Sequence, residues 1–145
     1  MENIYFKTTV IWAQIDANQH MRHSAYADVA AQARVQMLDS IGLDSKAFFI
    51  HKIGPILFRE EILYKREVHI SEKIKVSCQL TLCTRNGKKW SMRHEILKEN
   101  GELAAEIKVD GSWIDMKERK IVGLPEKLLE AFNQIPRSDD FKEID

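Results

Sequence analysis

The chain has 145 residues, the length of one ordinary domain, and its 22 basic residues balance 22 acidic ones. A formal net charge of zero excludes a global field that would recruit nucleic acid or an anionic membrane surface. A chain of this length buries roughly two-thirds of the surface that its unfolded form exposes, so its fold needs no disulfide or structural metal.

The sequence contains no recognisable secretory or membrane-spanning segment. The N-terminal residues lack a basic stretch followed by an apolar one, and no apolar run approaches the ~20 residues of a membrane span. Cys78 and Cys83 lie five residues apart, so an extended strand would point them to opposite faces. We therefore expect two reduced cysteines and predict a cytoplasmic protein.

The first half of the chain predicts one strand and one long helix. Residues 4–12 are rich in β-branched and aromatic types, which are typical of a strand. Over residues 26–41, apolar residues recur at spacings of three and four, which predicts a helix of about five turns with one buried face. Ser24 or His23 is the expected N-cap, and Gly42 stands where a C′ glycine belongs.

The second half of the chain predicts mainly strands. A short helical or irregular connection is expected at 44–52, and alternating apolar residues then predict four strands over 56–115. Asn86-Gly87 and Asn100-Gly101 separate the last three strands. Because both residues of an Asn-Gly pair tolerate the positive φ of a type I′ turn, we expect tight hairpins within an antiparallel meander. Pro125 opens a short closing helix that ends near residue 133.

This order of elements predicts an α+β fold in which one curved antiparallel sheet wraps around a single long helix. Residues 1–135 form one domain, and residues 136–145 are expected to be a loose polar tail. A sheet that holds one helix leaves its far edge and outer face open. Pairing of these surfaces with a second copy of the chain predicts a homodimer or a dimer of dimers.

The polar segment 16–26, between the first strand and the long helix, carries the densest set of reactive side chains. It contains an acid, an amide and two imidazoles. A carboxylate in a partly dry loop can act as a base or a nucleophile, and free N–H groups at a helix start can hold a developing oxyanion. Acyl transfer to water needs both groups near one carbonyl. The same residue types also suit a plain polar loop that caps the helix.

Other common chemistry has no motif in the chain. There is no Gly-rich phosphate loop, no Gly-x-Ser-x-Gly elbow and no Cys or His spacing typical of a zinc site. His20 and His23 would chelate a metal with Asp16 only if a further ligand joined them, and no His-Glu-x-x-His helix accompanies them. We therefore predict no metal and no cofactor.

Residues 8–42 resemble the signature of the hotdog-fold acyl-CoA thioesterases, the 4-hydroxybenzoyl-CoA thioesterase-like family. Asp16 stands at the acid position, and Gln19-His20 matches the long-chain acyl-CoA branch, with Met21 in place of a valine. Further matches in register are Tyr26, Arg34 and Ile41-Gly42. The rest of the chain is similar to this family in shape only.

The resemblance implies a single hotdog domain that hydrolyses an acyl-CoA or acyl-carrier thioester. Asp16 would attack the thioester carbonyl or activate the attacking water, and the backbone N–H at His23 would form the oxyanion hole. Gln19 would orient the water or a carbonyl. His20 and Tyr26 would hold the loop around the substrate. Coenzyme A would enter only as part of the substrate, with no nucleic-acid or membrane partner.

Three positions depart from the family pattern. Arg22-His23 replaces a pair of asparagines, and Ala31 stands where a helix carboxylate is expected. These changes keep a second function open, namely a hotdog module that binds an acyl thioester without cleaving it. Arg22 and Glu60 are assigned to substrate binding. Arg22 would contact a phosphate or an acidic acyl group unless it simply lies in solvent. Glu60 would reach the cleft as a second acid unless it pairs with an arginine.

Overall fold

The computed structural model describes residues 3–145 of the chain. None of the helices formed by these residues has the length and apolar character needed to cross a membrane. In chain order the elements are β1 (Ile4–Thr9), the 3₁₀ helix η1 (Trp12–Gln14), α1 (His23–Ser40), α2 (Ser45–His51), β2 (Ile53–Tyr64), β3 (Lys73–Ser77), β4 (Gln79–Thr84), β5 (Lys89–Lys98), β6 (Leu103–Asp115), β7 (Ile121–Val122), α3 (Glu126–Phe132) and β8 (Arg137–Ile144).

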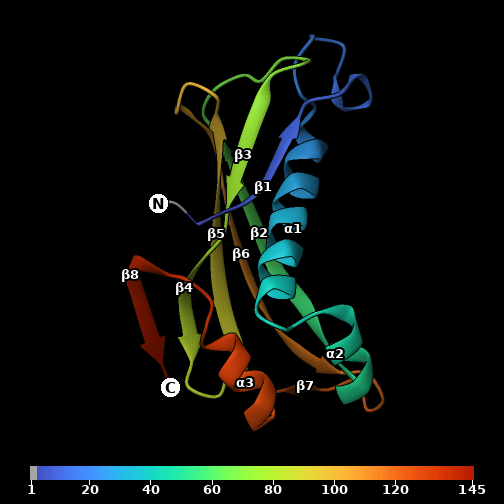
Figure 1. Ribbon diagram of the computed structural model, residues 1–145, viewed down its shortest axis with the longest axis vertical. Coiled ribbons are helices and arrows are strands. Elements are labelled where there is room, and N and C mark those ends of the chain that lie inside the picture. Colours follow the sequence, from blue (N-terminus) through green and yellow to red (C-terminus); the bar gives the residue numbers. More distant parts are fainter. Residues whose placement is uncertain (1–2) are drawn as a thin grey trace.

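One eight-stranded sheet carries the fold, and the long helix α1 runs along it (Figure 1). β3 and β4 follow one another along the sheet, and both pair with β5 on one side. On the other side β1 pairs with β3 and β8 pairs with β4, so the first and last strands share one edge. β6 lies beyond β5, and β2 forms the opposite edge beside β6.

The predicted meander is correct from β4 to β6 but wrong for β2. β2 pairs with β6 rather than with β3, and β5 and β6 lie between β2 and β3. The two Asn-Gly loops are too short for anything but a hairpin between neighbouring strands. Residues 65–72, which join β2 to β3, can each span up to ~3.3 Å, so this connection is long enough to cross the end of the sheet.

Both predicted hairpins form, but with a different turn geometry. The N–H of Gly87 donates to the carbonyl of Thr84 at 3.0 Å, and that of Gly101 donates to Lys98 at 2.9 Å. Only the glycines have positive φ, 72° and 92°, while the asparagines before them do not. The connections are therefore three-residue turns that end in a left-handed glycine, and the predicted type I′ geometry is wrong.

The long helix buries the predicted face. The buried side chains of α1 are those of Ala25, Tyr26, Val29, Ala30, Ala33, Met37 and Leu38. Gly42 follows with φ of +89°, as expected for a C′ glycine. The N-cap is Arg22 and not Ser24 or His23, and no side chain caps this end. The Ser24 hydroxyl instead accepts a hydrogen bond from the Arg22 Nε at 3.0 Å.

The first strand is shorter than the predicted range 4–12. It ends at Thr9, and the side chains of Ile11 and Trp12 are exposed. The chain then turns into η1, where the Gln14 side chain accepts a hydrogen bond from the Ile11 N–H at 3.0 Å. A local side-chain contact of this kind competes with continuation of the strand. The connection at 44–52, expected to be helical or irregular, contains the helix α2, and the closing helix predicted at 125–133 forms as α3.

The prediction of a loose tail at residues 136–145 is wrong, because this segment forms β8. Its pairing with β4 is parallel, and the Leu80 N–H donates to the Pro136 carbonyl at 2.7 Å. Arg93 pairs with Asp140 at 3.3 Å across the strands. The polar composition predicted a solvated tail, but the open edge of β4 offers this segment a row of backbone partners.

Both cysteines are free, and both are buried. Their five-residue offset predicted opposite faces, which holds only for an uninterrupted strand. The chain breaks between β3 and β4 at Cys78, and a bulge follows between Leu80 and Leu82. The extra residue of a bulge reverses the alternation, so Cys78 and Cys83 both turn inward.

The core contains one fully buried histidine, His94 of β5. The Arg34 Nη1 lies 2.8 Å from the His94 Nε2, and the His94 Nδ1 lies 2.9 Å from the Ser77 carbonyl. A guanidinium only donates, so Nε2 accepts and the Nδ1–H donates. Burial, reinforced by the positive charge of Arg34, lowers the pKa of His94 to about 3. The imidazole is therefore neutral at physiological pH.

Candidate functional site

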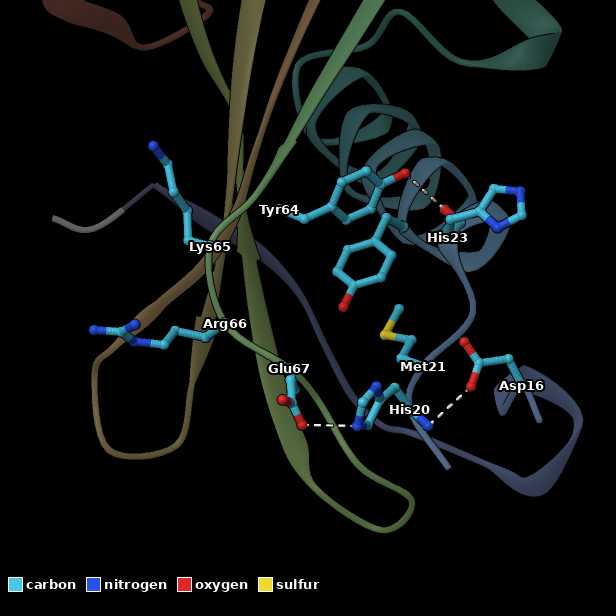
Figure 2. Close-up of a pocket in the computed structure, with 9 residues that line it drawn as sticks. Asp16, His20, Met21, His23, Tyr64, Lys65, Arg66 and Glu67 are labelled. Carbon is cyan, nitrogen blue, oxygen red and sulfur yellow. Dashed lines mark hydrogen bonds and ion pairs between the residues drawn. The ribbon is translucent and has the colours of Figure 1, made fainter. Parts of the chain in front are cut away.

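Asp16 lies in a tight loop between η1 and α1. Ile15 and Met21 form an isolated bridge across the base of the loop. One carboxylate oxygen of Asp16, Oδ1, accepts hydrogen bonds from the N–H of Asn18 at 2.8 Å and of His20 at 3.1 Å. Figure 2 shows the bond from His20. Within residues 3–145, no donor binds the second oxygen, Oδ2. The backbone thus fixes the carboxylate and leaves one oxygen available.

The helix α1 begins directly after this loop with exposed backbone donors. The N–H of Arg22 donates to Gln14 at 2.7 Å, and the N–H of Ala25 donates to Arg22 at 3.0 Å. Among the residues that the structure describes, no side chain accepts from the N–H groups of His23 or Ser24. Free N–H groups and the helix dipole together favour a negative charge at this point.

A pocket of about 330 Å³ lies between this loop and the chain that follows β2 (Figure 2). The Asp16 loop and the first turn of α1 form one wall, and the end of β2 forms the other. Its volume lies at the lower end of the range found for small-molecule sites. The lining residues are Asp16, His20, Met21, His23, Tyr26, Tyr64, Lys65, Arg66 and Glu67.

The second wall exists because β2 ends at Tyr64, earlier than the predicted strand 56–68. The N–H groups of Lys65 and Arg66 both donate to the carbonyl of Ala104, at 2.8 and 3.0 Å. Two donors on one acceptor break the regular ladder between β2 and β6. The chain beyond Arg66 therefore leaves the sheet and turns toward the Asp16 loop.

Two contacts hold this second wall against the Asp16 loop. The Met21 N–H donates to the Val68 carbonyl at 2.7 Å. The His20 Nε2 lies 2.7 Å from the Glu67 Oε2, as Figure 2 shows. A backbone hydrogen bond and a side-chain contact thus define the distance between the two walls of the pocket.

Two tyrosines form the apolar part of the pocket. The rings of Tyr26 and Tyr64 meet edge to face, with centroids 5.0 Å apart and an interplanar angle of 89°. The Tyr64 hydroxyl donates to the His23 carbonyl at 3.4 Å. Burial, and then the nearby Tyr64 and Asp16, raise the pKa of Tyr26 above its usual value. Tyr26 is therefore a neutral phenol at physiological pH.

The structure brings four of the seven predicted site residues together. The four that line the pocket are Asp16, His20, His23 and Tyr26. His23 contributes its position at the helix start, because its imidazole points away from the Asp16 carboxylate in Figure 2. The remaining three, Gln19, Arg22 and Glu60, lie outside the pocket wall.

These three residues have other surroundings. Gln19 is exposed with a φ of 70°, and its carbonyl lies 3.3 Å from the His69 Nδ1. The Arg22 guanidinium donates to the Ala13 carbonyl and to Ser24. Glu60 is exposed on β2, and its negative charge opposes the lowering of the Arg34 pKa by burial.

Sequence reasoning missed the wall that follows β2. Tyr64 and the three residues after it form a run of four polar or amphipathic side chains, which ends the alternation of the strand. That signal marks the end of a strand. It does not indicate that Glu67 faces His20, because this contact depends on the crossing of residues 65–72 over the end of the sheet.

Solved structures share this fold over nearly the whole chain. A hypothetical protein of Staphylococcus aureus, SAV2348, solved in complex with CoA, superposes with a TM-score of 0.84 at 20% identity, covering 92% of this chain and 84% of its own. The 1,4-dihydroxy-2-naphthoyl-CoA thioesterase Slr0204 from Synechocystis gives a TM-score of 0.78 at 18% identity, covering 89% of this chain and 94% of that protein. A DHNA-CoA thioesterase from Staphylococcus aureus gives a TM-score of 0.81 at 21% identity, covering 89% of this chain and 87% of that protein.

These similarities confirm the predicted fold, an α+β hotdog domain with a curved sheet around one long helix. A comparison with curated proteins finds no matching sequence. The model of the thioesterase-like superfamily matches residues 10–132, which include the Asp16 loop and both walls of the pocket. The predicted enzyme class, thioester hydrolase, is confirmed at the level of the family. Because this match spans most of the 145-residue chain, the chain belongs to the thioesterase-like superfamily.

Proposed function

We propose that this protein hydrolyses an acyl-CoA thioester and that Asp16 is its catalytic carboxylate. The observation that carries the proposal is the Asp16 carboxylate itself. Two backbone N–H groups hold its Oδ1, and its Oδ2 is available beside an uncapped helix start. Thioester hydrolysis needs a carboxylate and an oxyanion site close to one carbonyl.

In the proposed reaction, the thioester carbonyl lies between Asp16 and the N-terminus of α1. The Asp16 Oδ2 either attacks the carbonyl carbon, giving an acyl-aspartyl intermediate that water then cleaves, or removes a proton from the attacking water. The N–H at His23 stabilises the oxyanion. Gln19 would orient the water only after turning toward the pocket, because it lies outside the pocket wall in this structure. In either route water and thioester yield a carboxylic acid and a thiol. Asp16 passes the water proton to the leaving thiolate in the base route, whereas in the nucleophilic route the thiolate gains its proton from the water that cleaves the intermediate.

Coenzyme A is the carrier that we infer, since one similar structure holds CoA and two others are named as CoA thioesterases. The acyl group would occupy the pocket beside Tyr26. Arg22 and Glu60 would contact only the parts of the substrate that extend beyond the pocket wall. The reaction as proposed needs no cofactor. Two free, buried cysteines suit a reducing compartment, and we propose the cytoplasm.

We also propose that the protein forms a homodimer through the β2 edge. β2 is twelve residues long and pairs on one side only, with β6. Among its exposed side chains are the apolar Leu57, Phe58 and Leu63. A long edge strand with exposed apolar side chains favours pairing with another chain. Because Tyr64 at the end of β2 lines the pocket, a partner there would stand beside the site.

The test is thiol release from a panel of short, long and aromatic acyl-CoAs. Asp16→Asn keeps an oxygen that accepts from the N–H groups of Asn18 and His20, so the loop should persist. We expect this variant to lose at least about 100-fold in kcat/KM, the scale of a lost catalytic base or nucleophile. The matched control is Asp39→Asn, an exposed carboxylate near the other end of α1. Undiminished turnover by Asp16→Asn contradicts the proposal.

The same panel tests the second candidate, a module that binds the thioester without cleaving it. The observation that favours it is the side chain of Arg22, which replaces a family asparagine and binds the Ala13 carbonyl instead of facing the pocket. Saturable binding of an acyl-CoA by the wild-type protein, with no thiol released, would select this function.

A further inference from the structure

Three metal-ligating side chains converge beside the Asp16 pocket. They are His20 of the Asp16 loop together with Glu67 and His69 of the loop after β2. The Glu67 Oε2 lies 2.7 Å from the His20 Nε2 and 3.6 Å from the His69 Nε2. The two imidazole rings meet edge to face with centroids 5.2 Å apart. One ligand atom from each residue lies within 4.8 Å of the other two.

A second layer of contacts orients His69 for ligation. The His69 Nδ1 lies 3.3 Å from the Gln19 carbonyl, which can only accept, so the ring proton belongs on Nδ1. The lone pair of the His69 Nε2 then faces Glu67. Metal-ligating histidines in proteins characteristically donate their other ring N–H to a carboxylate or a carbonyl in this way. The His69 N–H also donates to the Glu72 Oε2 at 2.7 Å, which fixes the backbone here.

The backbone holds the two loops at a constant separation. The Met21 N–H donates to the Val68 carbonyl at 2.7 Å. Met21 follows His20 in the Asp16 loop, and Val68 lies between Glu67 and His69 in the other loop. The Lys98 Nζ donates to the Glu67 carbonyl at 2.9 Å and anchors the second loop to β5. An ion that binds here would therefore need little additional ordering of the chain.

We propose that His20, Glu67 and His69 form a binding site for a divalent transition-metal ion of the zinc class. Two imidazoles and one carboxylate are a zinc donor set, whereas Mg²⁺ and Ca²⁺ prefer oxygen ligands throughout. Tetrahedral ligands at about 2.0–2.1 Å from Zn²⁺ lie roughly 3.3 Å from one another. The distances from the Glu67 Oε2 to the Nε2 atoms of His20 and His69, 2.7 and 3.6 Å, lie on either side of that value.

The fourth coordination position belongs to water or to a small ligand. Two of the three ligands, His20 and Glu67, also line the pocket, so the ion would stand in its wall. This donor set differs from the combination of Asp16, His20 and His23 that the sequence suggested. Figure 2 shows why, because His20 and Glu67 meet while the His23 imidazole points away. The site does not depend on the proposed hydrolysis.

The experiment measures Zn²⁺ binding by titration calorimetry, using protein without an affinity tag that has been stripped with a chelator. The variants are His69→Gln and Glu67→Gln, and the matched control is His51→Gln at the C-terminal end of α2. We expect one Zn²⁺ per chain for the wild type and for the control. Each cluster variant should bind at least tenfold more weakly, because it loses a ligand. Co²⁺ should give a visible spectrum typical of four-coordinate sites that disappears in His69→Gln.

Thermal unfolding separates a lost ligand from a lost fold. In the presence of chelator, the wild type and both variants should unfold at similar temperatures. Excess Zn²⁺ should raise the midpoint for the wild type and the control, but not for His69→Gln, because only an ion bound to the folded state stabilises it. If His69→Gln does not fold, Glu67→Gln decides. Equal affinity in wild type and cluster variants, or no stoichiometric binding by the wild type, overturns the proposal.

Discussion

The neutral imidazole of His94 couples the stability of the fold to pH. Burial and Arg34 lower its pKa from the ordinary 6.5 to about 3. Between these values the unfolded chain binds a proton that the folded chain excludes, so stability rises with pH across this window. The contribution is fully present above pH 6.5 and is lost as the pH falls toward 3, with a total of roughly 5 kcal/mol.

We predict that His94→Gln weakens this acid dependence. A glutamine can still accept from Arg34 and donate to the Ser77 carbonyl, but it takes up no proton. When the pH is lowered from 7 to 4.5, protonation of His94 in the unfolded chain should decrease the free energy of unfolding by about 2–3 kcal/mol. His94→Gln should not show this part of the decrease. Urea denaturation at the two pH values measures it, with His51→Gln as control. Identical pH dependence in wild type and His94→Gln would contradict the assigned pKa.

Individual residues differ in how far the sequence could reveal their role. Asp16 could be found because a local signature surrounds it, from Gln19-His20 to Tyr26, and the chain folds that signature into one loop. Glu67 and His69 carry no such signature. They reach His20 through a tertiary hydrogen bond, from Met21 to Val68, and no local pattern encodes that contact.

Among the elements, β8 offers the sharpest test, because it covers the edge of β4. Cys83 on β4 is opposite Glu143, and burial raises the pKa of its thiol. We predict that a chain ending at Pro136 unfolds about 5–10 °C lower and that its Cys83 reacts with a thiol reagent in native buffer. In the full-length chain neither cysteine should react.

The control for this prediction is the same truncation with Cys83→Ser, which should abolish the labelling. A folded truncated protein whose thiols stay unreactive would mean that β8 does not protect β4. The comparison is informative because Cys78 lies at the junction of β3 and β4, beside the part of the edge that β1 covers, and should remain protected in both proteins.

The elements themselves were largely predictable, whereas their order in the sheet was not. The stripe over residues 26–41 and the two Asn-Gly pairs are local patterns, and they predicted α1 and both hairpins. The place of β2 beside β6 and the pairing of β8 with β4 depend on which strand edges remain open after the rest has folded. Distant segments compete for these edges, and the hydrophobic periodicity of one segment does not indicate which other segment it pairs with.

At the scale of the whole molecule, the proposed homodimer can be tested at one side chain, that of Phe58. Phe58 lies on the β2 edge and is 60% exposed. We predict that Phe58→Glu converts the proposed dimer into a monomer in sedimentation velocity experiments, because pairing of the edge would bury an unpaired carboxylate. Phe49→Glu, at a 69% exposed position on α2, is the matched control and should leave the dimer intact. A dimer that tolerates Phe58→Glu uses another surface.

The two edges of the sheet differ in a way that would limit growth by pairing of sheet edges. On one edge lie two strands shorter than β2, namely β1 with an irregular register and β8 with five charged side chains. On the other lies the single long strand β2. A sheet with two receptive edges can add copies without end and grow into a fibre. With only one such edge, the first copy that pairs with it would occupy the receptive edge of both molecules, so edge pairing would stop at two.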